Sequence, residues 1–168
     1  MLGLGKLGTK MVHLGRAFGM NVIAWSQNLT PDHAASAGAR AVTKEELFEQ
    51  PDVLSIHLIL SDRTRGLVGK AEIGRMKQGA ILINTSRGPI VDEEALVDAL
   101  NRRSIAAGLN VFDQEPLPAD HPLRKAPNTV LTPHLGYVTE NAYREYYEDV
   151  IDDILAWRAG NPVRVLKA

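Results

Sequence analysis

The chain has 168 residues, 45% of them hydrophobic, and its 19 Lys and Arg stand against 20 Asp and Glu. This length suits one domain with a sizeable core. The balanced charge, without a long block of one sign, argues against a nucleic-acid-binding protein. The absence of cysteine excludes a disulfide framework and a thiolate metal site, and no metal site is predicted. Short, interrupted apolar runs predict no membrane span, and a soluble cytoplasmic protein is the default prediction because no targeting signal is visible.

A glycine-rich turn, Gly3-Leu4-Gly5-Lys6-Leu7-Gly8, opens the chain. Gly3 permits a tight turn, Gly5 lets the backbone approach a pyrophosphate, and Gly8 allows a helix to pack closely on a strand. The N–H groups of the following helix face the phosphates. Taken alone, such a turn also fits an unliganded loop or an adenosyl cofactor. Only Met1 and Leu2 precede it, so the first strand of a dinucleotide-binding fold is expected to be largely missing.

Strands and helices alternate along the rest of the chain. Strands are predicted at 21–25, 39–42, 52–60, 80–84, 105–111 and 129–131, with 52–60 and 80–84 buried. Helices are predicted at 7–16, 34–37, 70–76, 92–102 and 141–159, the last being the long helix of segment 137–159. Thr43 and Glu46 form a capping box that opens one more helix. This alternation favours an α/β fold with a doubly wound, Rossmann-like parallel sheet.

Three short segments each supply one chemically useful side chain beside an apolar run. They are Asn84-Thr85-Ser86-Arg87-Gly88, Gln114-Glu115-Pro116-Leu117 and Thr132-Pro133-His134-Leu135-Gly136. An arginine can hold a carboxylate through two hydrogen bonds, a histidine can transfer a proton near neutral pH, and a glutamate can orient that histidine. Together they suit removal of a hydride and a proton from a 2-hydroxy acid, although singly each is more typical of a surface charge or a turn. His13, His33 and His121 lack such a context and are interpreted as solvated or structural.

With these motifs the chain resembles the nucleotide-binding domain of the D-isomer-specific 2-hydroxyacid dehydrogenases over essentially all of its length. The strongest signature is Gly79-Ala80-Ile81-Leu82-Ile83-Asn84-Thr85-Ser86-Arg87-Gly88-Pro89-Ile90-Val91-Asp92. The resemblance implies that residues 1–168 form a dinucleotide-binding domain and that the family's separate substrate domain is absent from this chain. We therefore expect a truncated member that is poorly active or inactive alone. The apolar face of its last helix, with Val150, Ile154 and Trp157, then needs another partner.

The resemblance also implies roles for individual residues. Arg87 would hold the substrate carboxylate, His134 would act as acid and base, and Glu115 would pair with the histidine and favour its charged form. These residues and the glycine turn are expected on one crevice. The residues implied to bind the cofactor are Gly3, Gly5, Lys6, Leu7, Gly8, Ser26, Gln27, Asn28, His57, Thr64, Thr85, Ser86, Asn110 and Gly136.

Three positions depart from the family pattern. No acidic residue lies near Ser26, Gln27 and Asn28, where one is expected to bind the adenosine ribose of NAD, and no arginine is adjacent either. These residues leave the choice between NAD and NADP open, and the resemblance to the family implies NAD as the expected cofactor. Ile59 stands where the family usually has a proline, two residues after the histidine that His57 matches. Asn110 replaces an aspartate that contacts the nicotinamide carboxamide, although its amide oxygen can still accept a hydrogen bond.

The resemblance implies an NAD(P)-dependent oxidoreductase that interconverts D-2-hydroxy acids and 2-oxo acids. The alternative is a catalytically silent dinucleotide-binding interaction module, and an enzyme with an adenosyl cofactor is disfavoured by the Arg-Glu-His set. The expected partners are a small 2-hydroxy or 2-oxo acid and a second copy of the chain in a homo-oligomer. Neither nucleic acid nor a membrane is expected.

Overall fold

A computed structural model describes residues 1–166 of the chain. The chain divides into two units, Met1–His134 and Leu135–Ala168, and each is described by itself. The first unit holds all the strands found in the described residues, together with the segments predicted to bind cofactor and substrate, except Gly136.

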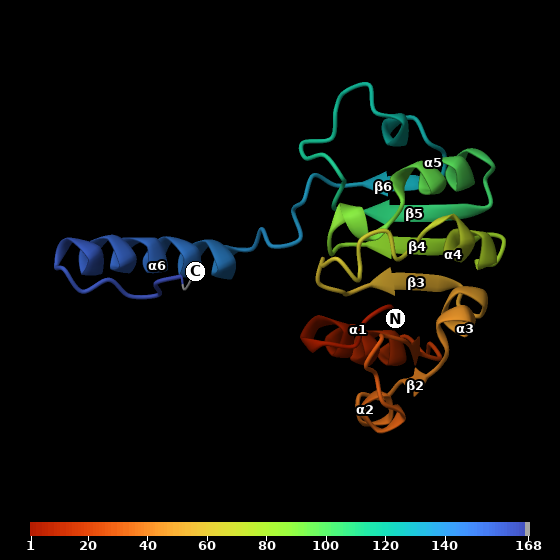
Figure 1. The fold of residues 1–168 in the computed structure, drawn as a ribbon, viewed down its shortest axis with the longest axis horizontal. Coiled ribbons are helices and arrows are strands. Elements are labelled where there is room, and N and C mark those ends of the chain that lie inside the picture. Colours follow the sequence, from red (N-terminus) through yellow and green to blue (C-terminus); the bar gives the residue numbers. More distant parts are fainter. Residues whose placement is uncertain (167–168) are drawn as a thin grey trace. The chain divides into compact units, whose positions relative to one another are not determined.

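Every strand of the first unit is parallel to its neighbours (Figure 1). One ladder pairs β1 (Ile23–Ala24) with β2 (Arg40–Ala41). The other has the order β3-β4-β5-β6 and consists of β3 (Val53–Ile56), β4 (Ala80–Asn84), β5 (Ile105–Leu109) and β6 (Thr129–Leu131). Parallel pairing requires a crossover between successive strands, and helices or long loops supply it here.

Leu2 joins the two ladders because it forms parallel bridges with Trp25 on one side and Ile56 on the other. Its N–H donates to the Ser55 carbonyl at 2.9 Å, and its own carbonyl accepts from the His57 N–H at 2.8 Å. The spatial order is therefore β2, β1, Leu2, β3, β4, β5, β6. Successive strands are added on one side of Leu2 as far as β2 and then, from β3 onward, on its other side. This confirms the doubly wound fold, in which the first strand is reduced to one paired residue.

The helices of the first unit follow the sequence prediction closely. They are α1 (Lys6–Ala17), α2 (Pro31–Ser36), α3 (Lys44–Glu49), α4 (Lys70–Arg75) and α5 (Glu93–Asn101). The predicted capping box opens α3, since the Thr43 hydroxyl accepts from the Glu46 N–H at 3.1 Å and the Glu46 carboxylate accepts from the Thr43 N–H at 2.9 Å. Two short 3-10 helices, η1 (Gly88–Ile90) and η2 (Pro122–Arg124), lie outside the predicted helices and strands.

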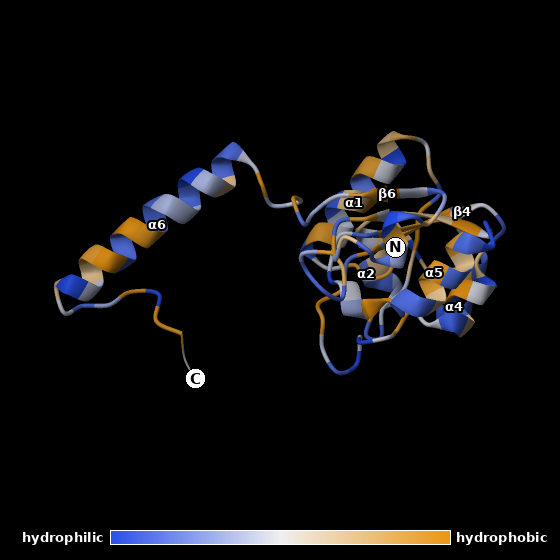
Figure 2. Cartoon of the chain, turned by 90° about the horizontal axis from the view of Figure 1, so that it is seen from above, coloured by the Kyte–Doolittle hydropathy of each residue, from blue (hydrophilic) through white to orange (hydrophobic). Residues whose placement is uncertain are grey.

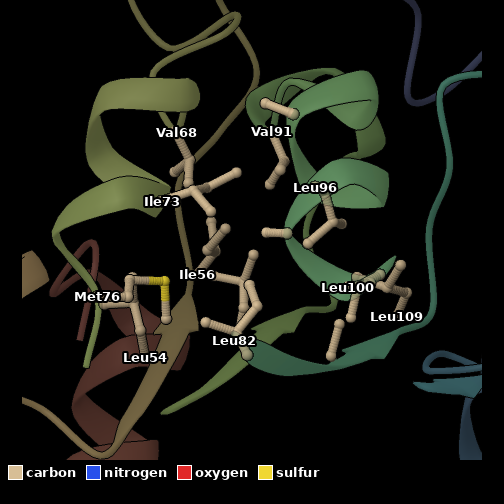
Figure 3. Close-up of a cluster of buried hydrophobic side chains, with 14 of the residues drawn as sticks. Leu54, Ile56, Val68, Ile73, Met76, Leu82, Val91, Leu96, Leu100 and Leu109 are labelled. Carbon is tan, nitrogen blue, oxygen red and sulfur yellow. The ribbon is translucent and has the colours of Figure 1, made fainter. Parts of the chain in front are cut away.

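Two clusters of buried apolar side chains place the helices on opposite faces of the sheet. The larger cluster packs Ile73 of α4 and Leu100 of α5 over Leu54 and Leu82 of the strands (Figure 3). The smaller cluster unites α1 and α2 with Ala24 of β1. Because side chains alternate along a strand, the face that carries Ala24 is opposite to the face that carries its neighbours in β1.

The face of the four-stranded ladder opposite the larger cluster is open within the first unit. Val53, Ile81 and Val130 lie on it, and Val130 is 70% exposed. The sequence-based expectation that strands 52–60 and 80–84 are fully buried is therefore wrong for this face. A strand's apolar composition does not tell whether a helix covers both of its faces, because that depends on where the crossovers run.

Helix α1 is also only partly covered. It packs through Gly8 and Val12, whereas the apolar residues whose spacing predicts the helix are exposed, including Leu7 at 66% and Phe18 at 81%. Leu14 lies on the same exposed stripe. The helix thus buries a narrow face lined by a glycine and a valine and leaves a wider apolar face in solvent.

The second unit consists mainly of α6 (Glu140–Arg158), which agrees with the predicted terminal helix. None of the residues of α6 is buried, and its strongly hydrophobic residues lie mainly in its C-terminal half (Figure 2). Arg164 folds back on the helix and forms ion pairs with Asp149 and Asp153 at 3.2 and 2.9 Å. Within residues 1–166, no helix is long and apolar enough to cross a membrane.

Candidate active site

The glycine turn adopts a conformation that only glycine accepts readily. Gly3 has φ +97°, and a Cβ there would lie 2.7 Å from the His57 carbonyl oxygen. A Cβ on Gly8 would lie 2.3 Å from the Gly3 carbonyl oxygen, so α1 crosses the turn at backbone contact. Gly5 is the N-cap of α1. No side chain at this position accepts a hydrogen bond from the first N–H groups of the helix, which face the glycine turn.

A crevice of about 1080 Å³ opens beside this turn, at the carboxyl ends of the first strands. We call it the glycine-turn crevice, and it is lined by 3–7, 25–29, 57–61 and 85–87 together with His33, Arg63, Thr64 and Leu67. Ligands of open parallel sheets bind at such a position, where the strand order reverses.

Most of the residues predicted to bind a cofactor line this crevice. They are Gly3, Gly5, Lys6, Leu7, Ser26, Gln27, Asn28, His57, Thr64, Thr85 and Ser86. Gly8 lies behind the turn and supports it. Asn110 is buried and lines neither this crevice nor the pocket described below. Gly136 belongs to the second unit, so its position relative to the crevice is not described.

His57 lies at the floor of the glycine-turn crevice, just after β3. Its Nε2 is 2.9 Å from the Ser55 hydroxyl. Burial lowers the pKa of His57, and the positive charge of the chain's amino terminus lowers it further. A neutral imidazole is therefore favoured at this position, next to the phosphate-facing turn.

Thr64 holds the loop that follows His57. Its hydroxyl donates to the Ile59 carbonyl at 2.7 Å and accepts from the Ser61 N–H at 2.8 Å. Ile59, which replaces the family proline, is exposed. Its side chain therefore takes no part in the packed core.

Asn84, at the end of β4, organises the loop that carries Arg87. Its side-chain amide donates to the Arg87 carbonyl at 2.9 Å, and its amide oxygen accepts from the Ser86 N–H at 3.0 Å. Ser86 in turn donates to the Ile56 carbonyl at 3.1 Å. Asn84 is almost fully buried, and its role was not recognised in the sequence, although a polar residue ending an apolar strand was a usable signal.

A second hollow, of about 570 Å³, holds the predicted acid-base pair. We call it the histidine pocket, and it is lined by Phe112, Glu115, Pro116, Leu117, Arg124, Leu131, Thr132, Pro133 and His134. The Nδ1 of His134 lies 2.6 Å from Oε2 of Glu115, and the other carboxylate oxygen accepts from the Phe112 N–H at 2.9 Å. His134 has φ +49°, an uncommon conformation for a residue with a side chain.

Arg87 and the acid-base pair thus line two hollows rather than the one crevice that was expected. Both hollows lie at the carboxyl ends of parallel strands, which share one edge of the sheet. Burial raises the pKa of Glu115, but the hydrogen bonds from His134 and Phe112 and the charges of His134 and Arg87 outweigh it and leave this pKa low. The positive charge of Arg87 therefore contributes to the lowered pKa of Glu115.

Asn110 directly follows β5 and bonds residues at the ends of the two neighbouring strands, β4 and β6. Its N–H donates to the Asn84 carbonyl at 3.0 Å, and its side-chain oxygen accepts from the Thr132 hydroxyl at 2.9 Å. Three further titratable residues line the hollows without having been predicted there, and one of them, Arg124, lines the histidine pocket. His33 and Arg63 line the glycine-turn crevice, and His33 was interpreted as solvated or structural.

A glycine turn opening a helix, beside a crevice at the switch point of a doubly wound parallel sheet, defines a dinucleotide-binding domain. Residues 1–136 match the family described as "D-isomer specific 2-hydroxyacid dehydrogenase, NAD binding domain". The chain therefore belongs to the D-isomer-specific 2-hydroxyacid dehydrogenases. A nicotinamide dinucleotide is the cofactor of this domain type, and the glycine turn with its uncapped helix fits the pyrophosphate of such a molecule.

Relatives and solved structures agree with this assignment. The chain is 40% identical over 161 residues to a glyoxylate reductase of Aeropyrum pernix. The alignment covers 95% of the chain and 48% of that protein. It is 38% identical over 164 residues to a D-3-phosphoglycerate dehydrogenase of Bacillus subtilis, covering 97% of the chain and 31% of that protein. The chain thus spans about half or less of these relatives' length.

Among solved structures, a putative D-3-phosphoglycerate dehydrogenase from Ralstonia solanacearum superposes with a TM-score of 0.91 at 40% identity, covering 98% of this chain and 48% of that one. A D-lactate dehydrogenase from Lactobacillus jensenii, solved with NAD+, gives a TM-score of 0.82 at 29% identity, covering 99% of this chain and 54% of that one.

Proposed function

We propose that this chain is the nucleotide-binding part of an NAD(P)-dependent oxidoreductase that interconverts D-2-hydroxy acids and 2-oxo acids. The observation that carries the proposal is the 2.6 Å hydrogen bond between Glu115 and His134, at the sheet edge where Arg87 also lies. An imidazole oriented by a carboxylate suits proton transfer. The family assignment supplies the hydride chemistry that this proton transfer would complete.

In the proposed mechanism each residue has a separate task. Arg87 binds the substrate carboxylate and orients the 2-oxo group. His134, with Nδ1 bonded to Glu115, gives a proton from Nε2 to the oxygen in reduction and takes it back in oxidation. A nicotinamide dinucleotide held by the glycine turn would supply the hydride donor or acceptor for C2 of the substrate. Glu115 is a positioning residue, since its carboxylate bonds Nδ1 and fixes the orientation of the imidazole.

The proposal is tested with the 168-residue chain, NADH, and either glyoxylate or hydroxypyruvate. We expect NADH binding with slow turnover, because hydride transfer needs a closed, water-excluding cleft. Arg87→Ala and His134→Ala are each expected to lower that turnover at least about 100-fold. In His134→Ala, NADH affinity should stay within about twofold of the parent value. Turnover that survives both substitutions, or failure to bind NADH, would contradict the proposal.

The alternative, a catalytically silent dinucleotide-binding module, keeps cofactor binding and lacks turnover. Arg87 lines the glycine-turn crevice and not the histidine pocket, and an arginine that binds only the cofactor would favour this alternative. The two proposals differ in one readout. Binding of the substrate analogue oxamate to the NADH complex, lost in Arg87→Ala, supports the enzyme, and absence of oxamate binding to the parent chain supports the silent module.

We further propose that a second copy of the chain covers the exposed apolar stripe of α1. Leu14 and Phe18 are more than half exposed, and Met11 lies on the same side of the helix, which suits a self-complementary interface across a twofold axis. Light scattering at micromolar concentration should therefore give a dimer or higher oligomer. A stable monomer would contradict this. The cytoplasmic location stays a prediction.

A further inference from the structure

The glycine-turn crevice has no acidic side chain in its lining. Its charged and titratable residues are Lys6, Arg63, Arg87, His33 and His57, drawn from four separate segments of the chain. Three of these side chains are permanent cations near neutral pH. A ligand with several negative charges is attracted into such a crevice, and each further negative charge on the ligand increases that attraction.

The end of β1 is the part of the crevice that decides between the two nicotinamide dinucleotides. A domain that prefers NAD places a carboxylate here to bind the ribose 2′-hydroxyl, and that carboxylate repels a 2′-phosphate. In this chain the positions are taken by Ser26, Gln27 and Asn28, and the turn is closed by a hydrogen bond of 3.0 Å from the Leu29 N–H to the Ser26 carbonyl. A hydroxyl and two amides donate to phosphate oxygens and carry no repelling charge.

His33 adds a polar group to the same crevice from α2. Its Nε2 lies 3.2 Å from the Leu4 carbonyl oxygen, which can only accept, so Nε2 carries the proton and donates. This bond ties the imidazole to the glycine turn. The imidazole of His33 therefore forms part of the crevice lining, where it brings a second ring nitrogen, Nδ1, and no negative charge.

We propose that this crevice accepts a 2′-phosphorylated dinucleotide, so that the chain binds NADPH at least as tightly as NADH. This rests on the proposed dinucleotide binding and adds a specificity to it. The 2′-phosphate brings up to about two more negative charges at pH 7. It meets amide and hydroxyl donors at the end of β1, and it lies in the attractive field of three cations with no opposing carboxylate in the lining.

The test measures the dissociation constants of NADH and NADPH for the 168-residue chain by calorimetry at low salt and again at high salt. We expect NADPH to bind as tightly as NADH within about twofold, or more tightly, at low salt. Its affinity should fall more steeply with salt because screening acts on more charge. NADH binding that is more than about twofold tighter at low salt overturns this inference and leaves the proposed function standing. Binding of neither cofactor overturns both.

A matched pair of variants tests whether charge at the end of β1 is the cause. Gln27→Asp introduces the missing carboxylate, and Gln27→Asn changes the length of the side chain without adding charge. We expect Gln27→Asp to weaken NADPH binding about tenfold more than NADH binding, and Gln27→Asn to leave the ratio of the two constants within about twofold. An unchanged ratio in Gln27→Asp overturns the proposal. Thermal unfolding of each variant confirms that the chain is folded.

Discussion

At the scale of single residues, the acid-base pair shows how backbone and side chain act together. The carboxylate of Glu115 is bonded at one oxygen by the Phe112 N–H and at the other by Nδ1 of His134. Both oxygens of the carboxylate therefore form hydrogen bonds, and the imidazole is held in one orientation. The unusual backbone of His134 costs energy, and the hydrogen bond to Glu115 offsets part of it.

The low pKa of Glu115 predicts a pH-dependent contribution to stability. Its stabilising effect is present above the ordinary carboxyl value of 4.5 and is lost as the pH falls through the lowered value, because the unfolded chain binds the proton first. Glu115→Gln should therefore lower the free energy of unfolding by less than about 1 kcal/mol near pH 7, since the pair is partly exposed.

Urea unfolding of parent and Glu115→Gln at about pH 7 and about pH 3 measures this difference. The difference between the two proteins should shrink at the lower pH. A difference that is equal at both pH values would show that the carboxylate charge plays no part in stability.

At the scale of secondary-structure elements, two close backbone contacts hold the sites together. The first is between α1 and the glycine turn at Gly8. The second joins the start of η1 to the segment after β5, because a Cβ on Gly88 would lie 2.1 Å from the Phe112 carbonyl carbon. This contact links the loop of Arg87 to the residue whose N–H binds Glu115. Tight packing of backbone on backbone leaves no flexible atom to move aside.

Gly88→Ala is therefore expected to lower the free energy of unfolding by about 3 kcal/mol, near the upper end for overpacking. Gly74→Ala is the matched control, because it lies inside α4 and a Cβ there meets nothing within 4 Å. Alanine at that helical position should stabilise the chain by roughly 0.5 to 1 kcal/mol. Urea unfolding of both variants checks this. Equal stabilities of the two variants would contradict the close contact at Gly88.

At the scale of the whole molecule, the centre of the sheet makes a second pH-dependent contribution to stability. The amino group of Met1 donates to the Ile23 carbonyl at 2.6 Å, and burial lowers its pKa to about 5 from an ordinary value of 8.0. The unfolded chain therefore binds a proton more readily than the folded chain between these values. Stability should rise as the pH increases from about 5 to about 8, by up to about 4 kcal/mol.

Urea unfolding of the 168-residue chain across this pH range measures the slope. The control is the same chain acetylated at Met1, which keeps an N–H donor and loses the titrating amine. The acetylated chain should show a much flatter profile. Equal slopes for both chains would mean that the amino group is solvated in the folded state.

Local sequence patterns predicted the elements well, because the interactions that define them are local. The capping box of Thr43 and Glu46 and the helix that begins after Asp92 depend on residues three or four positions apart. The signature around Arg87 likewise identified the family from a continuous segment. The short 3-10 helix η2 was not among the predicted helices, since its three residues carry no periodic signal.

The sequence by itself determined the order of strands and helices, the glycine turn and the set of chemically useful side chains. The tertiary structure alone decided which of these meet. Glu115 and His134 are 19 residues apart and come together because parallel strands end at one edge of the sheet. The open sheet face, the buried role of Asn84 and the crevice without acidic side chains have the same origin, since contacts between distant segments leave no periodic pattern in the sequence.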